Sequence, residues 1–127
     1  MKPKSLCLLT CASFARETAA LAGEADLVQV VFGIYPNRCG RPPLSWEEVR
    51  SVVGPPEQCA AIRIFGGCCL AALGDPPPDL AHCTVTRLEN CFELVADQRT
   101  VAGLTASGSY LVSAGWLAQL CSGFLLN

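Results

Sequence analysis

Cysteine is the residue type in this sequence with the greatest capacity for chemistry. The chain has 127 residues and nine cysteines, and an odd number cannot all pair as disulfides within one chain. Cysteine thiolates bind soft metal ions and attack electrophiles, whereas buried thiols pack as small apolar groups. We therefore expect about half of these cysteines to be core residues and the others to act as metal ligands or redox groups.

Four cysteines follow segments with the composition of buried strands. They are Cys11 after residues 6–9, Cys39 in the loop after 27–32, Cys68 after 60–65, and Cys91 after 84–88. The carboxyl ends of parallel strands meet at one edge of a sheet, where ligands bind, and neighbouring strands are about 4.8 Å apart. We expect Cys11, Cys68 and Cys91 to share one metal site there, with Cys39 as a fourth ligand.

Zinc, iron or an iron–sulfur cluster is the cofactor expected of such a ligand set. The sequence has no Cys-x-x-Cys pair, so the usual spacing of a zinc ribbon is missing. The alternative is that these thiols only fill small spaces where helices begin. The positive ends of those helices are expected to lower the thiol pKa values and so to favour thiolates.

A small ligand is the second expectation at the same edge. Gly66 and Gly67 stand between a strand and a helix, where backbone N–H groups bind anions. We expect Gly66, Gly67, Cys69 and Asn90 to contact this ligand, although Asn90 is also a good helix cap. Neither a G-x-G-x-x-G fingerprint nor a P-loop lysine is present, so nucleotide binding has little support.

The other cysteines are expected away from this edge. Cys7 and Cys121 fall inside an apolar strand and an apolar helix, and both are predicted core residues. Cys59 and Cys83 precede strands and belong to the opposite edge. The only histidine, His82, also precedes a strand that spans about 16 Å, which argues against a Cys–His catalytic pair. No catalytic residue is assigned.

The elements that must position these residues alternate along the chain. Strands are predicted at 6–9, 27–32, 60–65, 84–88 and 110–113, and helices at 13–22, 45–53, 68–73, 89–96 and 115–126. Ser45 and Glu48 form a capping box, and the segment from Gly54 cannot continue that helix. Alternation predicts βαβ units. The expected fold is one three-layer doubly wound α/β domain, flavodoxin-like or Rossmann-like, with a mainly parallel sheet of about five strands over residues 1–127.

The composition of the chain limits the kinds of binding partner and the cellular compartment that we expect. Apolar residues make up 51% and charged residues 16%, so a large core is expected. The net charge is −2 without a basic stripe, which argues against nucleic acid. No apolar run approaches about 18 residues, so membrane insertion is not expected. A chain with such a core does not need disulfides, which favours the reducing cytoplasm. The apolar residues 124–126 indicate a domain cut from a longer chain or a helix docked on a partner, such as another domain or a second copy.

Four short motifs carry a resemblance to a known family. They are Cys11 after the first strand, the Gly67-Cys68 turn, the Asn90-Cys91 turn, and the segment GSYLVSAGWL at 108–117. This pattern resembles an uncharacterised domain-of-unknown-function family of methanogens and other anaerobes, whose genes often lie near those of corrinoid-dependent methyltransferases. The resemblance implies a cysteine-lined pocket and a link to a metal, a cluster or a corrinoid. Asn90 stands where that family has an acidic residue, which puts proton transfer at this position in doubt.

Three functions remain open from the sequence. The leading hypothesis is a thiol-rich ligand- or metal-binding sensory domain, the input module of a signalling protein such as a sensor kinase. The second is a thiolate-dependent enzyme or accessory protein in corrinoid and methyl-transfer metabolism. The third is a structural dimerisation domain whose cysteines only fill the core.

Overall fold

The structure is a computed structural model that describes residues 5–23, 29–39, 41–55, 58–113 and 117. Within these ranges the chain forms strands and α-helices that are joined in places by short 3-10 helices. The strands are β1 (Ser5–Cys11), β2 (Val30–Tyr35), β3 (Cys59–Gly66) and β4 (Cys83–Arg87). The α-helices are α1 (Ala15–Ala22), α2 (Trp46–Val53) and α3 (Gln98–Ala106).

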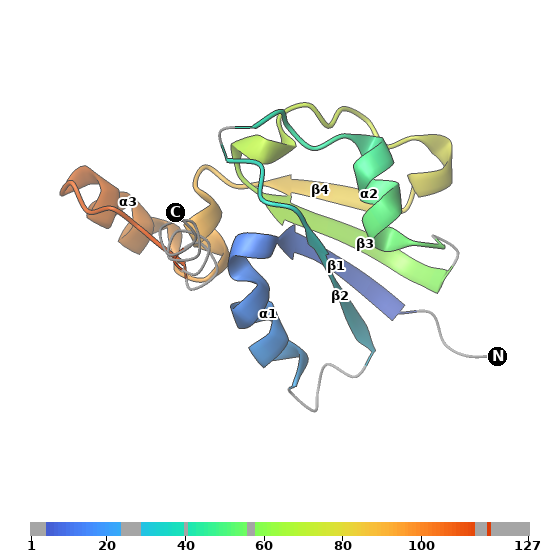
Figure 1. Ribbon diagram of the computed structural model, residues 1–127, viewed down its shortest axis with the longest axis horizontal. Helices are drawn as coiled ribbons and strands as arrows, with labels where there is room; N and C mark the ends of the chain where they lie inside the picture. Colours follow the sequence, from blue (N-terminus) through green and yellow to red (C-terminus); the bar gives the residue numbers. More distant parts are fainter. Residues whose placement is uncertain (1–4, 24–28, 40, 56–57, 114–116, 118–127) are drawn as a thin grey trace, which may run out of the picture.

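The described strands form one parallel sheet in the order β2-β1-β3-β4 (Figure 1). The register pairs Cys11 with Tyr35, Leu9 with Ile64 and Gly66 with Arg87, so the carboxyl ends of all four strands meet at one edge. The chain moves from β1 to β2 in one direction and then crosses β1 to reach β3. That reversal places a topological switch point between β1 and β3, where open parallel sheets bind ligands.

The two longer crossovers cover opposite faces of the sheet. Because β1–β2 and β2–β3 progress in opposite directions, right-handed connections place α1 and α2 on different sides. A Cβ added to Gly33 would lie 3.1 Å from Val52 of α2 and 3.4 Å from Leu9 of β1, so α2 packs on the face that carries Leu9. The expectation of an α/β fold with a parallel sheet is confirmed.

The hydrophobic core lies mainly between α2 and this face of the sheet. Its fully buried side chains come from strands, from α2 and from the loops that follow β2 and β3. They include Leu9, Tyr35, Leu44, Val49, Ile62, Ile64, Leu70 and Leu80. Ser45 caps α2 as expected, since its Oγ accepts a hydrogen bond from the backbone N–H of Glu48 at 3.3 Å. The helix ends before Gly54, whose φ of 73° suits glycine.

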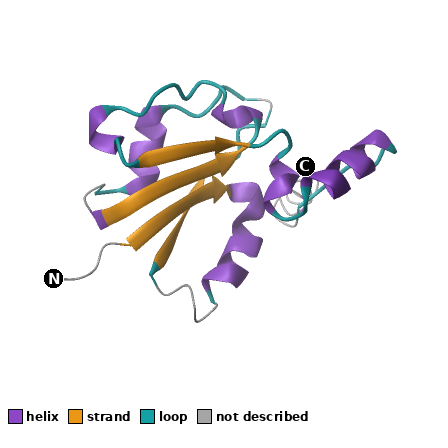
Figure 2. Ribbon diagram, turned by 180° about the vertical axis from the view of Figure 1, so that it is seen from behind, coloured by secondary structure: helices purple, strands orange, loops and turns teal. Residues whose placement is uncertain are grey.

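The predicted fifth strand is wrong, because residues 110–113 form no strand and the described sheet has four strands. Helix α3 carries the chain past the carboxyl edge and away from β4 (Figure 2). Tyr110 is 80% exposed and Val112 45% exposed, so these two side chains do not pack against the sheet. Its apolar composition favours a strand only where a neighbouring strand is available.

Two predicted helices are shorter than expected, and one helix was not predicted. The chain forms single 3-10 turns at Cys68–Leu70 and Cys91–Leu94 in place of helices at 68–73 and 89–96. Asp97 begins α3 instead, because its carboxylate accepts hydrogen bonds from the N–H and the hydroxyl of Thr100 at 2.8 and 2.9 Å. The predicted helix at 115–126 falls outside the described residues except at Leu117.

A disulfide joins Cys7 of β1 to Cys59 at the start of β3. The two Cα atoms are 5.9 Å apart and both residues are buried. The prediction that Cys7 is a core residue holds, but the expectation that the cysteines all remain thiols is wrong for this pair. Disulfides are typical of oxidising compartments, so the cytoplasmic location stays a prediction without support from this pair.

Membrane insertion was not expected from the sequence. None of the helices in the described ranges is both long enough and apolar enough to cross a bilayer.

Candidate functional site

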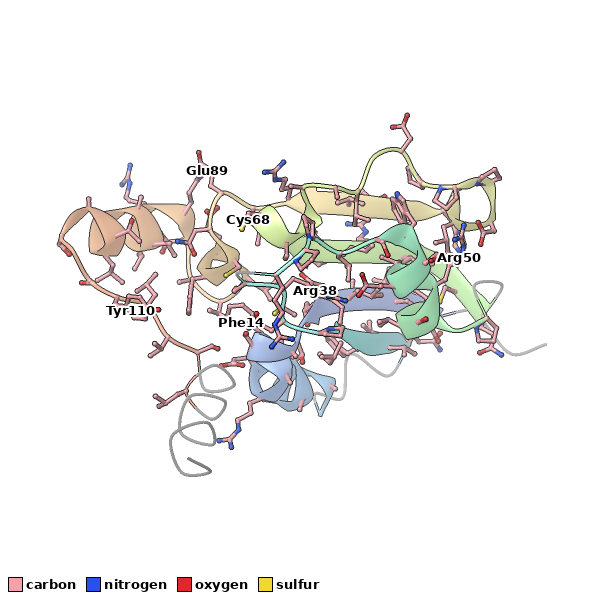
Figure 3. All side chains as sticks on the ribbon, turned by 45° about the horizontal axis from the view of Figure 1, so that its top comes forward. Phe14, Arg38, Arg50, Cys68, Glu89 and Tyr110 are labelled. Carbon is pink, nitrogen blue, oxygen red and sulfur yellow. A yellow bond between two sulfur atoms is a disulfide. The ribbon has the colours of Figure 1, made fainter. Side chains whose placement is uncertain are left out.

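A pocket with a volume of about 460 Å³ opens at the carboxyl edge of the sheet. The loops that leave all four strands contribute to its wall, together with the end of α3 and the segment after it. Most of the lining is apolar, with aromatic rings from several elements. Figure 3 shows Phe14, Arg38, Cys68 and Glu89 near this edge, while Arg50 lies toward the other end of the sheet.

Five cysteines line this pocket: Cys11, Cys39, Cys68, Cys69 and Cys91. The structure therefore brings together all four cysteines that the sequence assigned to a metal site and the one assigned to a ligand. Cys59 and Cys83 begin β3 and β4, which places them at the opposite edge as expected. Cys121 lies outside the described residues.

The exit from β1 is held by a hydrogen bond to sulfur. Cys11 Sγ accepts from the backbone N–H of Ser13 at 3.4 Å, so Cys11 caps the short 3-10 helix Ala12–Phe14. The expected cap, Ser13, is itself buried, and its hydroxyl accepts a hydrogen bond from the side-chain amide of Asn37. This bond ties the loop after β2, which carries Cys39, to the exit of β1.

The exits from β3 and β4 lie against each other. The N–H of Leu88 donates to the carbonyl of Gly66 at 2.7 Å. A Cβ added to Gly67 would lie 3.7 Å from the Cβ of Cys91, so the backbone of the glycine pair borders this cysteine. The carbonyl of Cys69 accepts from the N–H of Leu44 at 2.9 Å, which fixes the far end of the loop after β2 to the same place.

Tyr35 is the polar group at the floor of the pocket. Its side chain is fully buried, and its hydroxyl donates to the carbonyl of Phe65 at 2.6 Å. The same oxygen lies 3.7 Å from Cys69 Sγ. Burial raises the pKa of Tyr35 far above its ordinary value, and the nearby Cys69, Cys11 and Cys91 raise this pKa further. Tyr35 is thus a neutral hydroxyl among three thiols.

The two adjacent cysteines after β3 differ in exposure. Cys68 is exposed, whereas Cys69 is half-buried and reaches the hydroxyl of Tyr35. The sequence assigned Cys68 to the metal site and Cys69 to ligand contact, but Cys69 is the one that lies deeper in the pocket. A pattern of two consecutive cysteines in a turn does not reveal which sulfur points inward.

Burial opposes thiolate formation in this pocket. It is the largest cause that raises the pKa of Cys91 to about 11, and the neighbouring Cys39, Cys11 and Cys69 add to the effect. Burial and the same kind of neighbours also raise the pKa of Cys39. The expectation that helix ends lower thiol pKa values is therefore wrong for Cys91. The helix that begins at Cys91 is a single short turn, too short to oppose desolvation.

Asn90 acts as a helix cap. Its Oδ1 accepts from the N–H of Phe92 at 2.9 Å, and its own N–H donates to the carboxylate of Glu93 at 2.8 Å. These bonds complete a capping box and occupy the side-chain oxygen that was expected to contact a ligand. The residue still borders the pocket.

The charged side chains in the described lining are those of Arg38 and Glu89. Arg38 forms an ion pair with Glu48 of α2, which neutralises it at the pocket rim. Glu89 is exposed and accepts a hydrogen bond from Gln98 at 3.0 Å. The pocket consequently offers thiols, aromatic rings and the hydroxyls of tyrosine, serine and threonine side chains, with little net charge.

A preformed metal site is not seen at this edge. Within the part of the chain that the structure describes, no group of three or more His, Cys, Asp or Glu side chains is arranged to hold a metal ion. Binding of zinc, iron or an iron–sulfur cluster by Cys11, Cys39, Cys68 and Cys91 would require their sulfurs to move together. This assignment stays a prediction.

Sequence reasoning missed the aromatic part of the pocket. Phe14 and Phe92 pack edge to face with ring centroids 5.4 Å apart and an interplanar angle of 79°. Tyr35 was also missed, because the predicted strand 27–32 stops three residues before it, whereas β2 runs to Tyr35 at the edge where ligands bind. The contributions of Thr105 and Ser109 depend on α3, which was not predicted.

Comparison with known proteins adds no relative. The chain matches no family model, and no curated protein or solved structure is significantly similar to it.

Proposed function

We propose that this chain is a ligand-binding domain whose cysteine-lined pocket holds a small, mainly apolar ligand in contact with its thiols. The observation that carries the proposal is the pocket of about 460 Å³ at the switch point of the sheet, with five cysteines in an apolar wall. Small-molecule sites are mostly concave and apolar, contain few polar groups, and have volumes of about 300–1,000 Å³. Within a longer protein, such a domain would serve as a sensory or regulatory input.

Binding fits the pocket better than thiolate catalysis does. A nucleophilic cysteine needs a lowered pKa or an adjacent base, but burial raises the pKa of both Cys39 and Cys91. No histidine belongs to the described lining. The link to corrinoid and methyl-transfer chemistry stays a prediction from the resemblance alone.

An uncharged fluorophore, prodan, provides the test because its emission reports transfer into an apolar site. Leu111 lines the pocket and is half-buried, whereas the next residue, Val112, is exposed and does not line it. Leu111→Lys places a charge in the apolar wall and should weaken prodan binding about 10-fold or more, since burial of such a charge is costly. Val112→Lys adds the same charge nearby and should leave the affinity unchanged. Equal affinities for both variants and the native protein would remove the proposal.

A metal centre is the second candidate, favoured by the meeting of four strand-exit loops that each bring a cysteine to one pocket. Zinc, iron or an iron–sulfur cluster would be held by Cys11, Cys39, Cys68 and Cys91. Elemental analysis of anaerobically purified protein tests this candidate. A metal-free protein whose stability is insensitive to Cys91→Ala would contradict it.

A further inference from the structure

We infer that two copies of this chain associate through the outer edge of β2, so that the sheet of one copy continues into the sheet of the other across a two-fold axis. The inference goes beyond the proposed function, because Val30, Phe32 and Ile34 on this edge do not belong to the described lining of the pocket. It is carried by the backbone groups of β2, by the side chains of this strand and by helix α1 beside it.

β2 is an edge strand, and its register with β1 shows which of its backbone groups face outward (Figure 1). Leu6 pairs with Val30, and the N–H of Leu6 donates to the carbonyl of Gln29 at 3.0 Å. The backbone groups of Gln29 and of every second residue after it therefore face β1. Those of Val30, Phe32 and Ile34 face away from the sheet, and within the described residues they make no hydrogen bond to another element.

An antiparallel pairing centred on Phe32 satisfies all of these outward groups. Phe32 then pairs with Phe32 of the second copy, and Val30 pairs with Ile34, through the closely spaced hydrogen bonds of an antiparallel ladder. Pro36, which has no N–H, stays outside this ladder. The two Phe32 side chains form an aromatic cross-strand pair, an arrangement that stabilises sheets.

On the other face of the strand, the same register places an exposed valine opposite a glycine. Val31 is 52% exposed, and it would lie beside Gly33 of the second copy. A Cβ added to Gly33 would be 3.1 Å from Val52 of α2, so the valine would meet an apolar surface there. One strand supplies both members of this pair. The strand therefore matches its own copy, which identifies a second copy of the chain as the partner.

Helix α1 flanks the same edge with small and apolar side chains. It packs on β1 and β2, and the side chains of Ala19, Ala20, Leu21 and Ala22 in its second half are exposed. A helix centred over β1 and β2 would lie about 10 Å from its counterpart in the continued sheet, because neighbouring strands are about 4.8 Å apart. Helices pack at about this distance. Pairing of the strands would thus also bring the two α1 helices together.

The other edge strand, β4, is less suited to such pairing. The N–H of Leu88 donates to the carbonyl of Gly66 at 2.7 Å, so the backbone groups of Val85 and Arg87 are the ones that face outward. Arg87 is exposed and the exposed Glu89 follows it, and charged side chains at an edge oppose strand pairing. β2 contains neither a charged residue nor a proline. Because only one edge of each copy is engaged, the assembly closes as a dimer.

Sedimentation of the native chain over a range of concentrations tests the inference, with the Cys7–Cys59 disulfide intact. Species linked by disulfides between chains are identified on denaturing gels without reductant and removed first. The remaining protein should show a monomer–dimer equilibrium. A monomer at every concentration, or an open series of larger oligomers, would overturn the inference.

A matched pair of variants locates the contact. Val31→Lys places a charge beside the axis in both copies and should raise the dissociation constant of the dimer about 100-fold or more. Val95→Lys is the control, because Val95 is 49% exposed and belongs to no strand, and it should dimerise as the native chain does. Thermal unfolding shows whether both variants keep the fold. Equal dissociation constants in the two variants would refute the contact at β2.

Amide hydrogen exchange, resolved by NMR, identifies the paired strand without any substitution. The outward amides of Phe32 and Ile34 should exchange more slowly as the protein concentration rises, because the dimer gives them partners. The outward amide of Val85 on β4 should exchange at a rate that does not depend on concentration. Protection that grows at Val85 and not at Phe32 would place the contact on β4 and overturn the inference.

Discussion

The hydroxyl of Tyr35 donates a hydrogen bond to the carbonyl of Phe65 across the end of an intervening strand. Tyr35 ends β2 and Phe65 belongs to β3, while β1 lies between them in the sheet. The bond thus joins two strands that are not neighbours, directly beneath the pocket. It makes the pocket floor part of the hydrophobic core, so changes at this position affect both stability and binding.

Tyr35→Phe should lower the free energy of unfolding by about 1–2 kcal/mol, because the carbonyl of Phe65 loses its partner in a partly buried place. Tyr110→Phe is the matched control, since the ring of Tyr110 is 80% exposed. Chemical denaturation of both variants measures the difference. A loss no larger than that of the control would show that the bond does not support the pocket floor.

Gly66→Ala should lower the free energy of unfolding by about 1–3 kcal/mol through overpacking. A Cβ at this position would overlap the Tyr35 hydroxyl and lie 3.0 Å from Leu70. Gly103→Ala is the control, because Gly103 lies inside α3 with open space around it, and alanine there should stabilise by up to about 1 kcal/mol. Changes of the same sign in both variants would contradict the close packing at Gly66.

The sequence was sufficient for the parts of the fold that local patterns determine. The apolar runs at 6–9, 60–65 and 84–88 correspond to β1, β3 and β4, the run at 27–32 overlaps β2 only at 30–32, and Ser45 caps α2 as predicted. The strand order β2-β1-β3-β4 does not follow from such patterns, because a right-handed crossover determines which face a connection covers and not which strands are neighbours. The segment 110–113 has strand-like composition, but its conformation depends on where α3 leaves it, and this is a tertiary effect that composition does not contain.

The sequence predicted the location of the site more successfully than its chemistry. Topology was enough to bring Cys11, Cys39, Cys68 and Cys91 to one pocket. The protonation state of the Cys91 thiol was not predictable. Its raised pKa comes mainly from burial, and only the packed loops create that burial. The pairing of Cys7 with Cys59 also required the register of β1 and β3, which strand patterns alone do not supply.

Reduction of the Cys7–Cys59 disulfide should lower the free energy of unfolding by about 4 kcal/mol, because the bond closes a loop with a sequence separation of 52 residues. Chemical denaturation with and without reductant measures the loss. Cys83→Ala, which removes a buried free thiol, serves as a control whose stability should show the same response to reductant. If unfolded, unreduced protein shows nine reactive thiols, the disulfide is absent.

Alkylation of Cys91 should be slow near neutral pH and should continue to accelerate up to about pH 11, because burial raises its pKa to about 11. The pKa of Cys91 in the folded protein lies above the ordinary thiol value of 9.0. The folded state is therefore more stable when this thiol is neutral than when it is ionised. This contribution to stability is complete below about pH 9 and is lost as the pH rises to about 11. Peptide mapping after timed iodoacetamide treatment follows the rate. A rate for Cys91 that levels off below pH 9 would contradict the raised pKa.

Cross-linking with dibromobimane, which bridges two nearby thiols, tests most directly whether the strand-exit cysteines share one pocket. Mass-spectrometric mapping of the native protein should find bridges only among Cys11, Cys39, Cys68, Cys69 and Cys91 within the described chain, and none to Cys83. Bridges that join Cys11 or Cys91 to Cys83, or no bridge between different strand exits, would contradict the shared pocket.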